Sequence, residues 1–193
     1  MDGALPLGQE SVATVPLLGV WSVWWNCDRL TSLYSGYWNA PIFYPSVNSF
    51  TFSETMPISA VAAPLVWSTG KTVLSYNLLL LVALILNGYS AFRLLARMLQ
   101  DMWVAATSGA IVVLLPLVHH ELGVPQLVGL FGILWTLHAA VRLLEKPTFG
   151  RAVLLGVSFA VTYFLCNYYG LFLALLLLCC GGWLVGQIGR AHV

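Results

Sequence analysis

The carboxylates of this 193-residue chain are the side chains that could act as a general base or hold a divalent cation. Five of the seven acids lie before residue 72 or in one polar turn of the apolar second half: Asp2, Glu10, Asp28, Glu54 and Glu121. Each acid, taken alone, could instead simply solvate a loop. Glu10 and Glu121 are the least easily explained in that way, whereas Arg29 can pair with Asp28 and leave it structural.

His119 and His120 directly precede Glu121. Neighbouring residues of a helix point about 100° apart, so the two imidazoles do not form a two-histidine metal site by themselves. One of them could contact a phosphate or share a cation with a loop acid, and the simpler alternative is a polar pair at a membrane boundary. His138 lies within an apolar run, where an ionisable side chain is either functional or a neutral imidazole hydrogen-bonded to a neighbouring helix.

Aromatic side chains crowd the first quarter of the chain. They are Trp21, Trp24, Trp25, Tyr34, Tyr37, Trp38, Phe43 and Tyr44. Trp and Tyr favour the headgroup level of a bilayer because their rings are amphipathic, but the same rings can stack on a sugar or cover a lipid chain. Tyr168 and Tyr169 present the same two alternatives in a later turn.

The composition is that of a membrane protein. Hydrophobic residues make up 60% of the chain, and the mean hydropathy is +0.87. Only 8% of the residues are charged, whereas about a quarter of the residues are charged in a soluble domain. The net charge of +1 argues against a nucleic-acid partner. The four cysteines show no metal-binding spacing, and no nucleophile elbow, Walker loop or HExxH motif is present. The apolar composition makes the lipid bilayer the first predicted partner.

Residues 72–187 are nearly continuous apolar stretches separated by short polar breaks. Each stretch approaches the ~20 residues that cross a bilayer. We predict five spanning helices at 72–98, 102–118, 124–143, 149–166 and 170–187. The short breaks make consecutive helices antiparallel neighbours, so the predicted fold is an all-α, polytopic membrane helical bundle.

The basic residues predict the orientation of this bundle. Alternating sides place five of them on one face of the membrane: Arg93, Arg97, Arg142, Lys146 and Arg151. Only Arg29 and Lys71 fall on the other face, so the first face is predicted to be cytoplasmic. The opposite, non-cytoplasmic face then receives residues 1–71, the turn at His119–Glu121 and the turn at Asn167–Tyr169.

Residues 1–71 are predicted to form a non-cytoplasmic layer of short interfacial or re-entrant helices. Their apolar runs at 12–25 and 56–67 are short and contain prolines, which suits an interfacial position better than a span. Because nothing before this layer could carry it across the membrane, we expect a missing upstream helix and therefore a fragment. Residues 188–193 match a familiar translation of sequencing-adapter DNA and are predicted to be a non-native tail.

Several runs resemble bacterial GT-C-type membrane glycosyltransferase relatives. WWNCDRL at 24–30, GYWNAPIFYP at 36–45 and FSE at 52–54 are similar to the first outer loop of those chains. YNLLL at 76–80, HELG at 120–123 and YYG at 168–170 are similar to later parts. The likeness covers most of residues 7–187, although its motifs are loose.

The resemblance implies transfer of a sugar from a polyprenyl-phosphate donor at the outer leaflet of a bacterial inner membrane. An acid early in the first outer loop is the catalytic base or cation ligand in that class, and Glu10 stands at about that place. Asp28 is the nearest competitor for the catalytic role. The expected substrate contacts are His119, His120 and Glu121 at the donor phosphate, with Trp38, Tyr168 and Tyr169 around the sugar and lipid. The cofactor and the metal are not identified: Glu10 would either deprotonate the acceptor hydroxyl or help to hold a divalent cation.

The sequence leaves two other functions open. A transporter or flippase predicts helices broken by Gly or Pro with polar groups at mid-membrane, whereas the predicted spans are mostly unbroken. A non-catalytic membrane protein requires no lipid-linked sugar at all.

Overall fold

The computed structural model describes residues 3–9 and 12–191, and the side chains of this part as far as Trp183. It is 74% helical and has no strand among the residues described, which confirms the predicted all-α class. The elements are α1 (Thr14–Thr31), the 3-10 helices η1 (Ser49–Phe52) and η2 (Pro57–Ala62), α2 (Ala63–Thr69), α3 (Thr72–Leu99), α4 (Met102–Val113), α5 (Pro116–His120), α6 (Pro125–Val128), α7 (Phe131–Glu145), α8 (Phe149–Leu165) and α9 (Asn167–Ala191).

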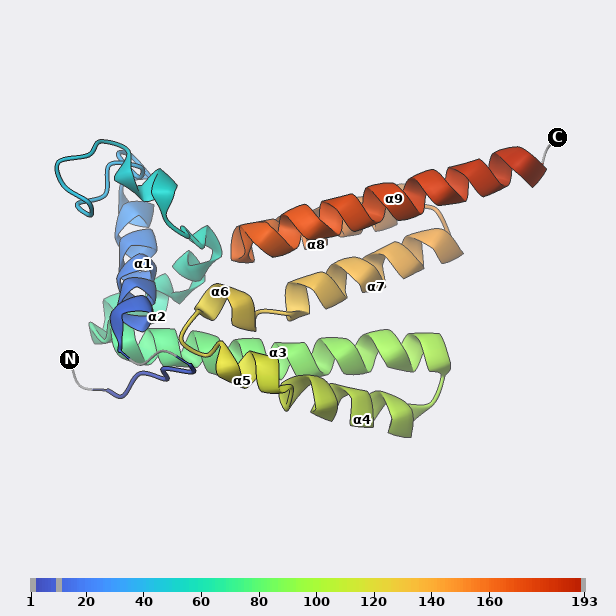
Figure 1. Ribbon diagram of the computed structural model, residues 1–193, viewed down its shortest axis with the longest axis horizontal. Helices are drawn as coiled ribbons and strands as arrows, with labels where there is room; N and C mark the ends of the chain where they lie inside the picture. The colour runs from blue at the N-terminus through green and yellow to red at the C-terminus, as the bar shows by residue number, and fades with distance from the viewer. Residues whose placement is uncertain (1–2, 10–11, 192–193) are drawn as a thin grey trace.

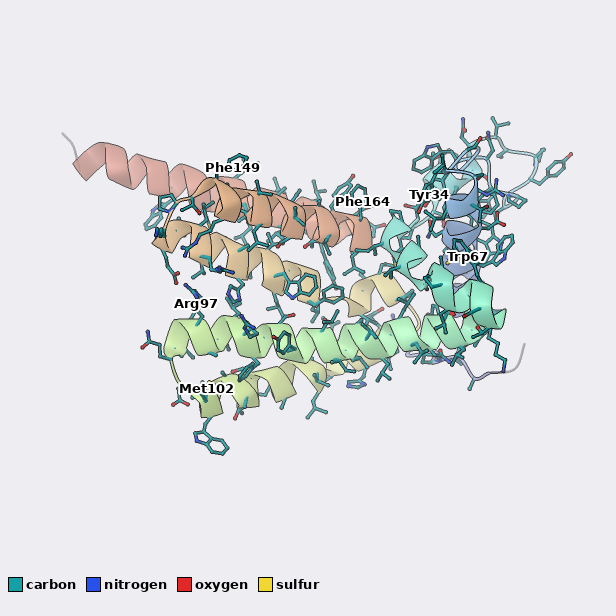
Figure 2. The ribbon with its side chains drawn as sticks, turned by 180° about the vertical axis from the view of Figure 1, so that it is seen from behind. Tyr34, Trp67, Arg97, Met102, Phe149 and Phe164 are labelled. Atoms are coloured by element: carbon teal, nitrogen blue, oxygen red, sulfur yellow. The ribbon has the colours of Figure 1, made fainter. Side chains whose placement is uncertain are left out.

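The molecule has a bundle and a helical layer across one end of it (Figure 1). Helices α3, α4, α7, α8 and α9 form the bundle and run along its length, whereas α1 runs across it. We call the covered end the α1 end and the opposite end the basic end. Figure 2 shows Tyr34 and Trp67 at the α1 end and Arg97 and Met102 at the basic end.

Three helical segments of the described chain are long and apolar enough to cross a membrane. They are Thr72–Leu99, Met102–His120 and Pro125–Glu145. The helices at Phe149–Leu165 and Asn167–Trp183 are apolar but shorter, so only three of the five predicted spans meet this criterion. None of the three lies before residue 72, where α1 combines apolar residues with Asp28 and Arg29.

The segments predicted to span at 102–118 and 124–143 are long and apolar enough to do so, but each contains a break that the sequence did not predict. Helix α4 ends at Val113, and a new helix begins at Pro116. Proline has no backbone N–H, and its ring clashes with a preceding helical turn, so the α4 helix cannot continue through it. The next segment stops at Val128 and resumes at Phe131. Both segments therefore consist of a short helix nearer the α1 end and a longer helix nearer the basic end.

Asn87, in the middle of α3, satisfies the backbone groups at the second break. Its amide nitrogen donates to the carbonyl of Val128 at 2.7 Å, and its oxygen accepts from the N–H of Phe131 at 2.7 Å. Asn87 is fully buried. Because an unpaired backbone group costs several kcal/mol in an apolar surrounding, this side chain allows the helix to break there.

Small residues bring the bundle helices close together. A Cβ on Gly109 of α4 would lie 2.8 Å from the carbonyl oxygen of Gly88 in α3, so only glycine fits there. Gly132 of α7 packs on Thr162 of α8 in the same way, and the Thr162 hydroxyl lies 3.1 Å from that of Thr136. At the basic end, Arg97 and Glu145 join α3 to α7 through an ion pair.

Asn26 holds the layer at the α1 end together. Its buried amide nitrogen lies 2.7 Å from the carbonyl of Thr55, 3.1 Å from that of Met56 and 2.9 Å from the Ser59 hydroxyl. Its oxygen accepts from the Tyr37 hydroxyl at 2.7 Å. Burial raises the pKa of Tyr37 to about 12, so this phenol stays a donor at neutral pH. One side chain thus ties α1 to η2 and to the aromatic loop.

Candidate functional site

The structure brings the segment before α1 onto the His119–Glu121 turn. The backbone N–H of Gln9 donates to the carbonyl of His120 at 2.8 Å, and the Gln9 side chain donates to Glu121 Oε1 at 3.2 Å. Gly8 makes the approach possible, because it has a φ of +60° and a Cβ there would lie 2.2 Å from the His120 carbonyl oxygen. Residues more than a hundred positions apart thus form one cluster.

Glu121 is the carboxylate at the centre of this cluster. Its Oε1 also lies 3.1 Å from Nδ1 of His120, which donates when that nitrogen carries the proton. The Glu121 side chain is only 15% exposed, whereas that of His120 is 54% exposed. No described residue donates to Oε2 of Glu121, so this oxygen keeps its capacity to accept a proton. Within the described part of the chain, this is a carboxylate held through one of its two oxygens.

The two histidines diverge. His119 Nε2 lies 2.9 Å from the carbonyl of Val113, the last residue of α4, so this imidazole caps the first helix break. His120 points instead to Glu121. Among the residues described, no three His, Cys, Asp or Glu side chains are close enough to hold a metal ion. His120 and Glu121 alone supply two donors.

The two residues predicted to be catalytic are placed differently. Glu10 lies outside the described residues; it follows Gln9 in the chain. Asp28 is fourteen residues beyond the start of α1, about 21 Å along that helix from the end near Gln9. It accepts from Nε of Arg29 at 2.9 Å, and the Arg29 guanidinium lies 4.5 Å from the Trp25 ring centroid. Asp28 therefore belongs to an ion pair at the far end of α1.

The aromatic candidates lie on three different elements. Trp38 is 49% exposed and packs edge-on against Tyr37 in the loop after α1. Tyr168 is exposed at the start of α9, and the Tyr169 hydroxyl donates to the carbonyl of Leu127 at 2.9 Å. Tyr169 therefore anchors α9 to α6. Tyr168 is exposed beside it, and a hydrogen bond with the Glu54 carboxylate raises the pKa of its phenol.

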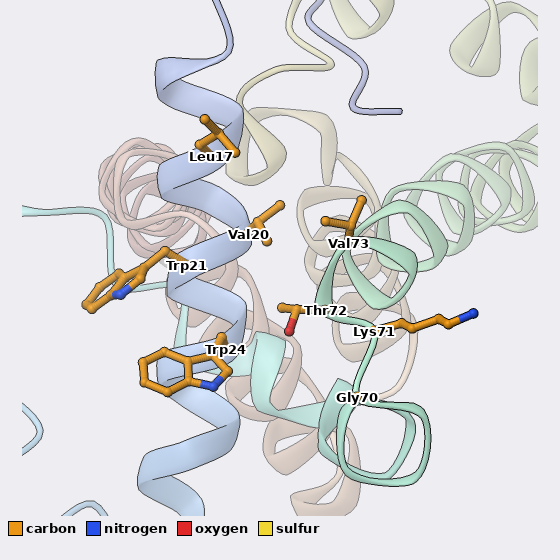
Figure 3. A pocket seen from close by; sticks show the side chains of 8 residues that line it. All are labelled: Leu17, Val20, Trp21, Trp24, Gly70, Lys71, Thr72 and Val73. Atoms are coloured by element: carbon orange, nitrogen blue, oxygen red, sulfur yellow. The ribbon is translucent and has the colours of Figure 1, made fainter. Parts of the chain in front are cut away.

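Two cavities adjoin the α1 end. One, of about 490 Å³, lies between α1 and the junction of α2 with α3, where Figure 3 shows Trp21 and Trp24 on α1. The Lys71 side chain extends away from these two indoles in the same view, so its charge is not directed at them. The other cavity, of about 310 Å³, is almost wholly apolar and lies between η2, α3, α7 and α8. Its wall includes Ile58, Leu79, Trp135 and Leu165, and it reaches Pro125 beside the Glu121 turn.

Sequence reasoning passed over three polar residues of this end. Gln9 holds Glu121, Asn77 donates to the carbonyl of Ala4 at 2.9 Å, and Asn87 bridges the helix break. The available signal was an amide within or beside an apolar run, where such a group needs a partner. Burial raises the pKa of the Cys27 thiol to about 11, so at neutral pH it carries little of the thiolate form that acts as a nucleophile.

Residues 34–186 match the family described as a domain of unknown function (DUF6311). No curated protein and no solved structure matches the chain. The matched residues include the Glu121 turn, the Asn87 bridge and both tyrosines at the start of α9, but the description of the family assigns no activity to them. Since the match covers well over half of its length, the chain belongs to this family, the domain of unknown function DUF6311.

Proposed function

We propose that the chain is a multi-pass protein of a bacterial inner membrane with its α1 end outside. In the three apolar segments no more than 33% of the residues are buried within the protein, so much apolar side-chain surface faces outward. Lipid is the surrounding that stabilises such a surface. The basic end carries five Arg and Lys residues, and the positive-inside rule directs that end to the cytoplasm.

The proposed activity is transfer of a sugar from a polyprenyl-phosphate donor to a hydroxyl acceptor at the α1 end. The observation that carries it is the Glu121 carboxylate, whose Oε1 is held by Gln9 and His120 while no described residue donates to Oε2. An apolar cavity of about 310 Å³ reaches Pro125, four residues further along the chain, and can receive part of a polyprenyl chain. Tyr168 adds an exposed ring at the same end for a sugar to stack on.

The chemistry requires one proton acceptor and stabilisation of one departing phosphate. Glu121 Oε2 takes the proton from the acceptor hydroxyl while the acceptor oxygen forms a bond to the anomeric carbon. The bond from that carbon to the phosphate oxygen breaks, and its electron pair leaves with polyprenyl phosphate. His120 is exposed and hydrogen-bonded to Glu121 through Nδ1, and with both ring nitrogens protonated it can donate from Nε2 to the departing phosphate. Among the described residues of the cluster, His120 is the group that can stabilise the departing phosphate.

Glu121→Gln tests the activity. Membranes containing the protein are given radiolabelled undecaprenyl-phosphate glucose or mannose with a panel of sugar acceptors. Loss of a general base lowers the rate by about 10²–10⁴, so Glu121→Gln should remove most transfer without lowering expression. Asp28→Asn is the matched control and should keep most of it. Equal turnover by Glu121→Gln and the unmodified protein would remove Glu121 from the mechanism. If the unmodified protein transfers sugar from neither donor, the proposal that it uses these donors is contradicted.

The broken helices favour a second candidate, transport. The helix that packs on the middle of α3 is interrupted between Val128 and Phe131, and Asn87 bridges the break. Interrupted membrane helices with a polar group at the break are typical of secondary transporters. A transporter moves the lipid-linked sugar between leaflets and leaves its glycosidic bond intact. Vesicles loaded with the same donor distinguish the two, because a transporter exposes the sugar on the opposite leaflet in the absence of an acceptor.

A further inference from the structure

A second polar cavity lies near the basic end, far from the Glu121 cluster. It has a volume of about 320 Å³, is lined by α3, α7 and α8, and opens to the outer surface of the bundle. Polar and aromatic residues of all three helices line it, among them Tyr89, Arg93, Trp135, His138, Arg142 and Ser158. The proposed transfer reaction uses none of these residues.

Among the described residues, neither arginine of this cavity forms an ion pair. Arg93 donates to the Tyr89 hydroxyl at 2.9 Å, a neutral acceptor. Nε of Arg142 is buried and has no hydrogen-bond partner within the described chain. The only ion pairs found among the described residues are Arg29 with Asp28, Arg97 with Glu145, and His120 with Glu121. Glu145, the acid nearest in the sequence to Arg142, is therefore already engaged.

An uncompensated guanidinium beside an apolar interior is costly unless an anion accompanies it. Two guanidinium groups from different helices face one cavity, and His138 and Ser158 add further polar groups to its wall. This donor set matches a phosphate, to which Arg binds through several N–H groups at once. His138 thus lines a cavity, and no hydrogen bond from it to a neighbouring helix occurs in the described part.

The surroundings of the cavity point to a lipid as the source of this phosphate. Tyr89 and Leu154, both exposed, lie at its edge, so it is bordered by the apolar outer surface of the bundle. Arg93 lies one turn from Arg97, about 6 Å further into the bundle, a depth that an arginine at headgroup level reaches readily. Basic pockets between membrane helices are a recurring site for anionic headgroups.

We propose that this cavity binds the phosphate of an anionic phospholipid, with Arg93 and Arg142 as its principal contacts. The acyl chains then lie along the outer surface of α8 past Leu154 and Val157, both of which are exposed. The inference goes beyond glycosyl transfer and does not depend on which side of the membrane the basic end faces.

Native mass spectrometry of the purified protein, from nanodiscs of phosphatidylcholine with phosphatidylglycerol, tests the proposal. The unmodified protein should retain one phosphatidylglycerol. Arg93→Gln with Arg142→Gln should weaken retention about twenty-five-fold, since each basic residue near an anionic headgroup contributes about a factor of five. Lys146→Gln, at the same end but outside the cavity, is the matched control. Equal retention by the double variant and the control would overturn the proposal, as would no retention by the unmodified protein.

A second variant covers the case in which the double variant fails to fold. Leu154→Glu places a carboxylate at the edge of the cavity, where it can pair with the arginines and should expel the lipid while both guanidinium groups remain. Retention unchanged in Leu154→Glu would contradict the proposal. Excess inorganic phosphate should leave the lipid bound; displacement of the lipid by free phosphate would show a soluble-anion site instead.

Discussion

The basic end and the α1 end of the bundle are built on different principles. At the basic end α3 passes to α4 through Gln100 and Asp101 alone, and Asp101 caps α4 by accepting from the N–H groups of Trp103 and Val104. From the middle of α3 to the α1 end the neighbouring helices are interrupted, and the side chains of Asn26, Asn87 and Gln9 hold the chain by hydrogen bonds. The chemistry that we propose lies where regular helix geometry ends.

The difference shows that helix breaks in this protein depend on individual amides. A helix satisfies its own backbone, so the basic end needs few buried polar side chains. Each break at the α1 end leaves N–H and C=O groups that another residue must satisfy. If the comparison is correct, removal of one amide should damage the α1 end more than removal of any polar group at the basic end.

The largest effect is expected from Asn87→Leu. The substitution leaves the carbonyl of Val128 and the N–H of Phe131 unpaired in the interior, which should lower the free energy of unfolding by about 2–5 kcal/mol. Ser90→Ala is the matched control, since the Ser90 hydroxyl bonds only to the carbonyl of Leu86 in its own helix. Unfolding by SDS in mixed micelles measures both. Similar loss in the two variants would show that Asn87 does not hold the break.

A smaller effect is expected from Gly109→Ala, which tests the close approach of α3 and α4. The added methyl group would lie 2.8 Å from the Gly88 carbonyl oxygen and should push the helices apart at a cost of about 1–3 kcal/mol. Gly156→Ala in α8 is the control, because a Cβ there meets nothing within 4 Å. The same unfolding experiment applies. An unchanged free energy of unfolding for Gly109→Ala would mean that the two helices can move apart without cost.

Alkaline pH should loosen the α1 end before the bundle. Burial raises the pKa of Tyr37 to about 12, above its ordinary value of 10.0, so the folded state favours the protonated phenol. This contribution to stability is complete below pH 10 and is lost as the pH rises from 10 to 12. Tryptophan fluorescence follows it, since the Trp25 indole donates to the carbonyl of Tyr37 at 3.1 Å. Tyr37→Phe should abolish this alkaline transition; a persistent transition would assign it to other groups.

The smallest effect is expected from Glu145→Gln at the basic end. Its partner Arg97 is on the surface, where solvent and salt weaken an ion pair. The melting temperature should change little, and any loss should vanish in high salt. A large loss would mean that the basic end also depends on a single polar contact.

The predictability of the fold follows the same division. The sequence predicts α3 and α8 within one residue of their observed ends, because both lie between polar breaks in one apolar run. It does not predict the breaks after Val113 and Val128, because a hydropathy pattern does not register a bridge from Asn87 to another helix. Pro116 was a visible signal for the first of these breaks.

The candidate site was predictable only in part. The alternation of the helices placed the Glu121 turn and the segment before α1 on one side, and the structure brings Gln9 and Glu121 into contact. The pairing of Asp28 with Arg29 was visible from their adjacency. The role of Gln9 as a hydrogen-bond donor was not, because it depends on a close approach at Gly8 that joins residues 112 positions apart in the sequence.

The most direct test of the account is the side of the membrane on which each end lies. Single cysteines replace Tyr44, 93% exposed in the loop after α1, and Gly150, exposed at the start of α8, in a protein stripped of its native cysteines. We predict that an impermeant maleimide labels Tyr44→Cys in intact cells, and Gly150→Cys only after permeabilisation. Labelling of Gly150→Cys alone in intact cells, or of both positions from one side, would contradict a spanning bundle whose α1 end faces outward.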